Sequence, residues 1–320
     1  MNKENKPLII LTGPTAVGKT ALSIRLAKDV NGEIISADSM QVYKMMDIGT
    51  AKIMPEEMQG VKHYLIDEFM PEEEFNVVKF KELALTYMEE IYAKGKIPII
   101  VGGTGFYIQA ILNDIDFTET AEDTSYRQYL QQVADEKGAE FLYEQLKKVD
   151  EEATKTIHQN NVKRVIRALE YYHQTGNKIS EHNEEQRQKE SPYNFAYFVL
   201  NHDRSILYDR IEKRIDAMME QGLLDEVTSL YNKGYSKNLV SMQGLGYKEL
   251  ISYLEGECTL EEAVYILKRD TRHFAKRQLT WFKRERDVIW LDKNEFNDNE
   301  DKILENMCAI LQEKNILQNS

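Results

Sequence analysis

Residues 8–20 read LIILTGPTAVGKT, an apolar run that leads directly into the pattern G-x-x-x-x-G-K-[ST]. The glycines of this pattern let backbone N–H groups wrap around an anion, and the helix that follows adds the positive end of its dipole. A helix is expected there because Leu22 and Leu26 lie four positions apart and share one face. The stretch therefore predicts a strand, a phosphate-binding loop and a helix, the opening of a P-loop α/β fold.

Further short apolar runs, each bounded by turn residues, follow along the chain: Ile34–Ile35, Tyr64–Ile66, Ile97–Val101, Phe195–Leu200 and Val288–Leu291. Strands this apolar are typical of a parallel sheet covered by helices on both faces. No strand-like run occurs between about Asp114 and Ser191, where the sequence is helical and rich in Glu, Gln, Lys and Tyr. The predicted fold class is α/β, a P-loop NTPase-like parallel sheet flanked by helices, with an inserted all-helical domain.

The pattern of strands also predicts the domain boundaries. Residues 1–114 and 192–296 form the P-loop α/β core with its C-terminal helices, and residues 115–191 form the helical insert. Residues 297–320 form an acidic and helical tail. Apolar residues at helical spacing in this tail predict a surface helix without a chemical role.

Composition excludes several classes of protein. Lys and Arg number 41 against 54 Asp and Glu, so the net charge of −13 excludes a generically cationic nucleic-acid coat protein but not a local basic patch. Cys258 and Cys308 form no disulfide framework, and the six histidines show no zinc-binding spacing. The first residues lack the apolar region of a signal peptide, and no apolar run is long enough to span a bilayer. We therefore expect a soluble cytoplasmic protein without a membrane partner.

Three polar residues are expected to lie together at one edge of the sheet. In the P-loop, Lys19 would reach the phosphates and Thr20 would place its hydroxyl on Mg²⁺. Asp38 follows the second apolar run, and the carboxyl ends of parallel strands line the ligand crevice of such a sheet. Its carboxylate could hold metal or accept a proton from a nucleophile, and the structural alternative is an N-cap for the next helix.

The sequence VGGTGFY at residues 101–107 follows the fourth apolar run. P-loop kinases and ATPases usually carry a Walker-B Asp at the end of a neighbouring strand, where it helps to hold Mg²⁺. Two glycines and Thr104 stand here instead. Glycines allow a close approach of backbone to a ligand, although a plain tight turn would use them as well. The missing carboxylate argues against an ordinary ATPase.

Two stretches are locally basic, residues 158–167 and residues 268–286. The second holds eight Lys and Arg against two acidic residues, with Phe274, Trp281 and Phe282 interleaved. Cations interleaved with aromatic rings suit contact with a phosphate backbone and unstacked bases. The alternative is a solvated helix face with Trp281 in the core.

Taken together, these motifs resemble the bacterial-type tRNA dimethylallyltransferases, also called tRNA isopentenyltransferases. The matching words occur in the family's order: GPTAVGKT (13–20), ISADSMQVYKMMDIGTAK (35–52), VGGTGFY (101–107), NNVKRVIRALE (160–170), MMEQGLLDEV (218–227), MQGLGYKE (242–249) and TRHFAKRQLTWF (271–282). Two departures are visible: Val17 stands where Ser is usual, and Asn161-Val162-Lys163 replaces an Asp-containing run.

The resemblance implies transfer of a dimethylallyl group from dimethylallyl diphosphate to N6 of adenosine 37 in tRNA, giving N6-dimethylallyladenosine and diphosphate. It makes Asp38 the general base and adds Lys19 and Thr104 to the catalytic residues, with Mg²⁺ as the cofactor. Arg210 and Arg214 lie four apart on one predicted helix, and the family motif favours Arg214 for the diphosphate. The implied diphosphate-binding residues are Gly13, Pro14, Thr15, Ala16, Val17, Gly18, Lys19, Thr20 and Arg214.

The resemblance also implies tRNA as the partner, with the helical insert gripping the anticodon stem-loop of a monomeric enzyme. A stacked base cannot be alkylated, so the enzyme would extrude it. The implied tRNA-binding residues are Asp38, Ser39, Met40, Gln41, Thr104, Arg127, Gln159, Asn160, Asn161, Val162, Lys163, Arg164, Gln243, Tyr247, Lys276, Arg277, Gln278 and Trp281.

Two alternative functions belong to other classes. A P-loop small-molecule kinase would explain residues 13–20 and Asp38 but would leave the basic stretch at 268–286 without a use. A non-catalytic RNA-binding module would explain the basic stretches but not a complete P-loop.

Overall fold

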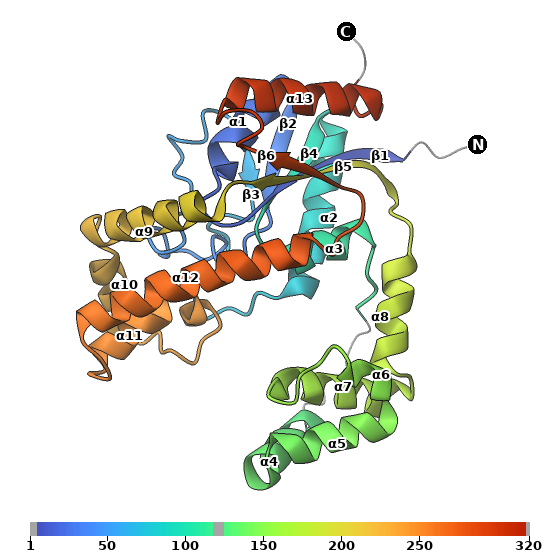
Figure 1. Ribbon diagram of the computed structural model, residues 1–320, viewed down its shortest axis with the longest axis vertical. Coiled ribbons are helices and arrows are strands. Elements are labelled where there is room, and N and C mark those ends of the chain that lie inside the picture. The colour runs from blue at the N-terminus through green and yellow to red at the C-terminus, as the bar shows by residue number, and fades with distance from the viewer. Residues whose placement is uncertain (1–4, 118–124, 318–320) are drawn as a thin grey trace. The chain divides into compact units, whose positions relative to one another are not determined.

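The structure, a computed structural model, describes residues 5–117 and 125–317, and within them six strands form one parallel sheet (Figure 1). The order of the strands is β3-β2-β4-β1-β5-β6. Their bounds are β1 Lys6–Thr12, β2 Gly32–Ser36, β3 His63–Tyr64, β4 Ile97–Gly102, β5 Tyr193–Asn201 and β6 Val288–Asp292. The α/β class and the six predicted strands are confirmed. The third strand ends before its predicted end because Leu65 has a φ of 60°, outside the extended region.

The central position of β1 in the sheet explains why its sequence is apolar without interruption. It pairs with β4 on one side and β5 on the other, and Leu8 to Leu11 are fully buried. Leu8 and Ile10 pack into the core on one face of the sheet, whereas Ile9 and Leu11 pack into the core on the other. A strand covered by helices on both faces needs apolar residues at every position.

Helices cover both faces of the sheet. One face packs against α1 (Lys19–Asp29) and α13 (Glu300–Glu313), and Ile303, Met307 and Leu311 of the predicted tail helix are buried in that layer. The opposite face holds the larger core and packs against a second set of helices, several of which line the site. These are α2 Val77–Ala93, α3 Gly105–Leu112, α9 Arg204–Glu220, α10 Leu223–Asn232, the 3₁₀ turn η1 Ser241–Gln243, α11 Tyr247–Leu254 and α12 Leu260–Phe282.

Residues 113–191 form a second compact unit, while the first comprises residues 1–112 and 192–320. The described part of the second unit is helical and contains no strand, and its core includes Leu142, Leu146 and Val165. Its helices are α4 Ser125–Lys137, α5 Ala139–Val149, α6 Glu151–Thr154, α7 Val162–Thr175 and α8 Ile179–Gln188. In neither unit does a described helix have the length and apolarity needed to cross a membrane.

Candidate functional site

The P-loop lies between β1 and α1, and its glycines meet a geometric need. Gly13 has a φ of 147°, and a Cβ there would lie 2.5 Å from the backbone oxygen of Leu200 on β5. Only glycine fits such a position. The ammonium of Lys19 lies inside the loop and donates to the backbone oxygens of Gly13 and Pro14, at 2.9 Å each. The predicted strand, anion loop and helix are therefore present in this order.

Lys19, Asp38 and Arg214 form a partly buried group of charges at the end of the sheet. Burial lowers the pKa of Lys19 to about 8, while the Asp38 carboxylate opposes this effect and the Arg214 guanidinium adds to it. Burial also lowers the pKa of Arg214, and Asp38 again opposes it. Two partly desolvated cations that face one carboxylate gain free energy when an anion joins them. The site is thus suited to a multiply charged phosphate group.

Asp38 lies directly after β2, at the edge of the sheet where the carboxyl ends of the parallel strands meet. Its Oδ1 accepts hydrogen bonds from the backbone N–H groups of Met40 (2.9 Å) and Gln41 (3.4 Å). Residues 37–62, all of which the structure describes, form turns and no helix. The alternative role of Asp38 as the N-cap of a helix is therefore wrong, because Asp38 caps a turn.

Gln278 on α12 joins the P-loop to the loop that follows β4. Its Oε1 accepts a hydrogen bond from the backbone N–H of Thr15 (2.9 Å), and its Nε2 donates to the backbone oxygen of Gly103 (3.0 Å). A Cβ on Gly103 would lie 2.1 Å from that Nε2. The glycine after β4 therefore serves a close approach between backbone and side chain. Both polar atoms of the Gln278 amide are engaged by the protein itself.

A cavity of about 420 Å³ opens beside these residues. Thr15, Asp38, Thr104, Arg214 and Gln278 supply polar groups to it. Apolar side chains from α9, α10 and α12 also line it, including Ile211, Ile215, Met218, Leu223 and Leu267. A second cavity of about 970 Å³ shares Thr15, Asp38 and Arg214 and adds Lys19 and Thr20. An anion site thus borders an apolar chamber.

Several of the predicted tRNA-binding residues line the first cavity and lie far apart in the sequence. They are Asp38, Ser39, Met40, Thr104, Gln243, Tyr247, Arg277 and Gln278. Tyr247 is fully buried, and its hydroxyl donates to the Glu226 carboxylate at 2.7 Å. Burial and the charge of Glu226 raise the pKa of Tyr247, so this hydroxyl stays protonated. Gln41 lines the second cavity instead.

The basic stretch on α12 divides into two parts. Lys268 pairs with Asp216, Arg269 with Asp270 and Arg272 with Glu212, so these cations are neutralised within the protein. Further along the helix, a cavity of about 380 Å³ is lined by His273, Lys276, Arg277, Thr280, Trp281 and Arg284. Trp281 is partly buried, edge-on to Phe106 with ring centroids 6.3 Å apart. The aromatic ring thus packs into the protein while the later cations remain exposed.

The predicted tRNA-binding residues of the helical unit lie on α4 and around the N-terminus of α7. Arg127 pairs with the buried Glu170 at 2.8 Å, and Arg167 approaches the same carboxylate at 3.3 Å. The N-terminus of α7 is capped by Asn161, whose side chain accepts from the backbone N–H of Arg164. This N-terminus is exposed, together with Gln159, Asn160, Lys163 and Arg164.

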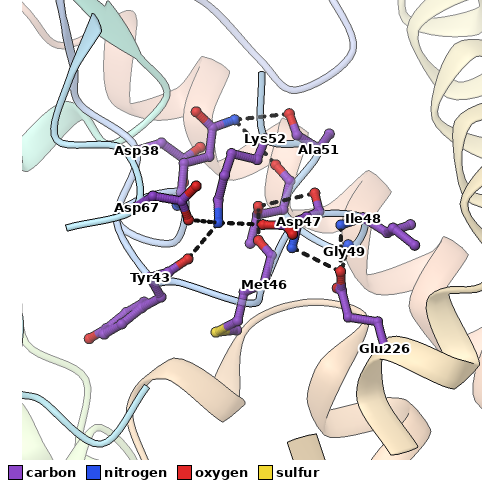
Figure 2. A network of polar contacts seen from close by, with 12 residues as sticks. Asp38, Tyr43, Met46, Asp47, Ile48, Gly49, Ala51, Lys52, Asp67 and Glu226 are labelled. Carbon is purple, nitrogen blue, oxygen red and sulfur yellow. Dashed lines mark hydrogen bonds and ion pairs between the residues drawn. The ribbon is translucent and has the colours of Figure 1, made fainter. Parts of the chain in front are cut away.

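Sequence reasoning missed the residues that hold the loop between β2 and β3. Figure 2 shows Lys52 inside this loop, where its ammonium contacts Tyr43, Asp47 and Asp67. The Glu226 carboxylate accepts backbone hydrogen bonds from the same loop. Both residues stand inside matching motifs, ISADSMQVYKMMDIGTAK and MMEQGLLDEV. Their presence in those motifs marks both residues, but it does not indicate which residues they contact.

Sequence comparisons match this chain to proteins of one family. A sequence model described as "IPP transferase" matches residues 41–285. A tRNA dimethylallyltransferase of Lachnoclostridium phytofermentans is 66% identical over 313 residues, which cover 98% of this chain and 100% of that protein. One from Acetivibrio thermocellus is 55% identical over 300 residues, covering 94% of this chain and 96% of that protein.

Solved structures agree with these sequence matches. The tRNA isopentenylpyrophosphate transferase of Bacillus halodurans has a TM-score of 0.73 and 44% identity, covering 98% of each chain. A eukaryotic dimethylallyltransferase acting on tRNA has a TM-score of 0.77 and 33% identity, covering 90% of this chain and 74% of that chain. The resemblance seen in the seven motifs is confirmed, and the chain belongs to the IPP transferase family.

Proposed function

We propose that the protein transfers the dimethylallyl group of dimethylallyl diphosphate to N6 of adenosine 37 in tRNA, forming N6-dimethylallyladenosine and diphosphate. The observation that carries this proposal is that a partly buried pair of cations, Lys19 and Arg214, adjoins a cavity whose lining includes a set of apolar side chains. An allylic diphosphate has this pattern of charge beside hydrocarbon. The names of the relatives favour this reaction over a small-molecule kinase.

The P-loop holds the leaving group in this proposal. As the allylic C–O bond breaks, negative charge grows on the diphosphate, and Lys19 and Arg214 are placed to stabilise it. The N6 nitrogen forms the new bond to carbon, and its proton passes to the carboxylate of Asp38, which lines the same cavity. Thr104, also in the lining, would hold the adenine for this attack.

Mg²⁺ fits the donors that this site offers. No group of three or more His, Cys, Asp or Glu side chains suited to a metal occurs among the residues described. Thr20 and Asp38 nevertheless line the same cavity, and Mg²⁺ commonly takes one or two protein oxygens together with substrate phosphates. Thr20 would hold the ion, whose charge supports departure of the diphosphate.

The tRNA would be held by exposed cations on each unit. Lys276 and Arg277 on α12 suit phosphate contacts near the cavity, and Lys163 and Arg164 suit such contacts at α7. The target adenosine must leave its stack to reach Asp38. The proposal includes action as a monomer in the cytoplasm, where tRNA is used.

Nucleoside analysis tests the reaction directly. Unmodified tRNA incubated with the protein, Mg²⁺ and dimethylallyl diphosphate should yield dimethylallyladenosine at position 37 and stoichiometric diphosphate. Unchanged tRNA, together with phosphorylation of a small metabolite from ATP, would instead establish the kinase.

A further inference from the structure

The loop that carries Asp38 has little regular structure of its own. Residues 37–62 connect β2 to β3 through turns, and Met45 and Ala51 have positive φ values of 63° and 47°. A long connection without helix or strand needs other contacts to keep one conformation. Gly49 and Thr50 of this loop line the 420 Å³ cavity together with Asp38, so the conformation matters at the site.

Glu226 supplies the contacts that fix this loop from outside. Its Oε2 accepts the backbone N–H groups of Asp47 (2.9 Å) and Ile48 (2.8 Å), and its Oε1 accepts that of Gly49 (3.1 Å). Tyr247 donates a fourth hydrogen bond to Oε1 at 2.7 Å. Three successive N–H groups around one carboxylate form an anion nest, and each bond is strengthened by the charge.

Hydrogen bonds inside the loop link the segment that Glu226 holds to Asp38 (Figure 2). The Gln41 side-chain amide donates to the backbone oxygens of Thr50 (3.2 Å) and Ala51 (3.1 Å). The backbone N–H of Gln41 in turn donates to Oδ1 of Asp38. A continuous series of hydrogen-bonded and adjacent residues therefore runs from Glu226 to Asp38.

Lys52 lies inside the loop and holds it through further contacts. Its side chain is 1% exposed, and its ammonium donates to the backbone oxygen of Tyr43 and to the Asp47 carboxylate, at 2.6 Å each, as well as to Asp67. Asp47 is therefore held twice, through its side chain by Lys52 and through its backbone by Glu226. The two contacts leave the segment 47–49 little freedom to move.

We propose that Glu226 is a positioning residue for the transfer reaction, which orients the Asp38 carboxylate by fixing the backbone of residues 47–49. The inference rests on the proposed function of Asp38 as the base. Glu226 lines the 970 Å³ cavity, but both of its carboxylate oxygens already accept hydrogen bonds from the protein, so in this proposal it acts through the loop. Misplacement of a reacting group by about 1 Å costs about 10²-fold in rate, so a distant anchor of this kind has a measurable kinetic effect.

Glu226→Gln tests the proposal, because the amide keeps the size of the side chain but loses the charge and turns one acceptor into a donor toward an N–H group. We expect the single-turnover rate to fall by about 10–100-fold, with KM for dimethylallyl diphosphate within about twofold of the wild type. Asp225→Asn is the matched control: Asp225 is exposed and shares the first turn of α10, so the same charge is lost there. It should retain the wild-type rate.

A double-mutant cycle separates positioning of Asp38 from a general structural effect. In an Asp38→Asn background, Glu226→Gln should cost less than about twofold, because the group that it orients is already removed. An equal loss in both backgrounds, or a wild-type rate for Glu226→Gln alone, would overturn the proposal. Dimethylallyladenosine formation by the wild type is measured in parallel, since its absence would refute the proposed function itself.

Tyr247→Phe is a second variant that tests the positioning role of Glu226 if Glu226→Gln does not fold. It removes one of the four hydrogen bonds to Glu226 and leaves the three from the backbone. We expect a smaller loss of about two- to tenfold in the single-turnover rate, which should again vanish in the Asp38→Asn background. A loss that persists undiminished in that background would contradict the positioning role.

Discussion

The side chain of Gln278 accepts a hydrogen bond from the backbone of Thr15, which lies 263 positions earlier in the chain. Through this contact and a second one to Gly103, helix α12 fixes the P-loop. Helix α12 therefore supports the proposed phosphate site as well as the proposed tRNA surface.

Gln278→Leu should remove both contacts and leave the Thr15 N–H and the Gly103 carbonyl without their partner. An unsatisfied group costs about 1–3 kcal/mol when fully buried, and these two are partly buried, so the free energy of unfolding should fall by less than that in urea titrations. We also expect KM for dimethylallyl diphosphate to rise, because Thr15 belongs to the anion loop. A variant with wild-type stability and wild-type KM would show that the bridge is unimportant.

Lys19 should impose a pH dependence on capture of the diphosphate. Its pKa of about 8 means that the free enzyme loses this positive charge as the pH rises through 8, so kcat/KM should fall on the alkaline side. Lys19→Ala should lower the rate by about 10²–10³-fold and abolish this limb of the profile. Lys19→Arg tests the same assignment, since an arginine stays charged and its residual activity should not decline near pH 8.

The same pKa predicts an effect on stability with a definite sign. The pKa of Lys19 in the folded protein lies below the value of 10.5 for an ordinary lysine, so between pH 8 and 10.5 the unfolded chain binds more protons. The contribution of this residue to the free energy of unfolding should therefore become more favourable as the pH rises through that window. Urea titrations of the wild type and Lys19→Met at pH 7.5 and pH 10 should differ in this direction. An equal change in both proteins would contradict it.

Exposed and paired cations on α12 should differ in their effect on tRNA. Replacing Lys276 and Arg277 by Gln should weaken tRNA binding and flatten its salt dependence by about one unit of slope for each lost phosphate contact. The control replaces Lys268 and Arg269, whose charges are held by Asp216 and Asp270. Binding isotherms at several salt concentrations should show no change of slope for this control, and equal slopes for both double variants would refute the assignment.

Asp38→Asn distinguishes the roles that the sequence left open. An amide still caps the turn at Met40 but accepts no proton, so the variant should fold normally and bind both substrates. As a general base, Asp38 should account for about 10²–10⁴-fold in kcat. A metal ligand behaves differently, because excess Mg²⁺ would then restore part of the rate. Single-turnover rates across a Mg²⁺ titration separate the two roles.

The fold could be predicted because its signals are local. Leu8 to Leu11 identify a strand buried on both faces, and the glycines that follow identify the loop. Asp38 could be placed because the carboxyl ends of parallel strands meet at one edge. The contacts of Glu226 with residues 47–49 and of Gln278 with Thr15 and Gly103 could not be predicted, since they join residues 175 to 263 positions apart and no local pattern reports such contacts. The end of β3 depended on one residue, Leu65, whose backbone conformation no apolar pattern reveals.

The position of β5 in the sheet has a consequence for the order in which the protein is made. β4 ends at Gly102 and β5 begins at Tyr193, so 90 residues must be synthesised between two strands that flank β1. At about 5–20 residues per second, a ribosome needs about 5–18 s for this stretch. During that time an edge of β1, apolar on both faces, has no partner strand and can template aggregation. The nascent chain therefore keeps this edge unpaired while its helical unit is being translated, and chaperone binding is expected in that interval.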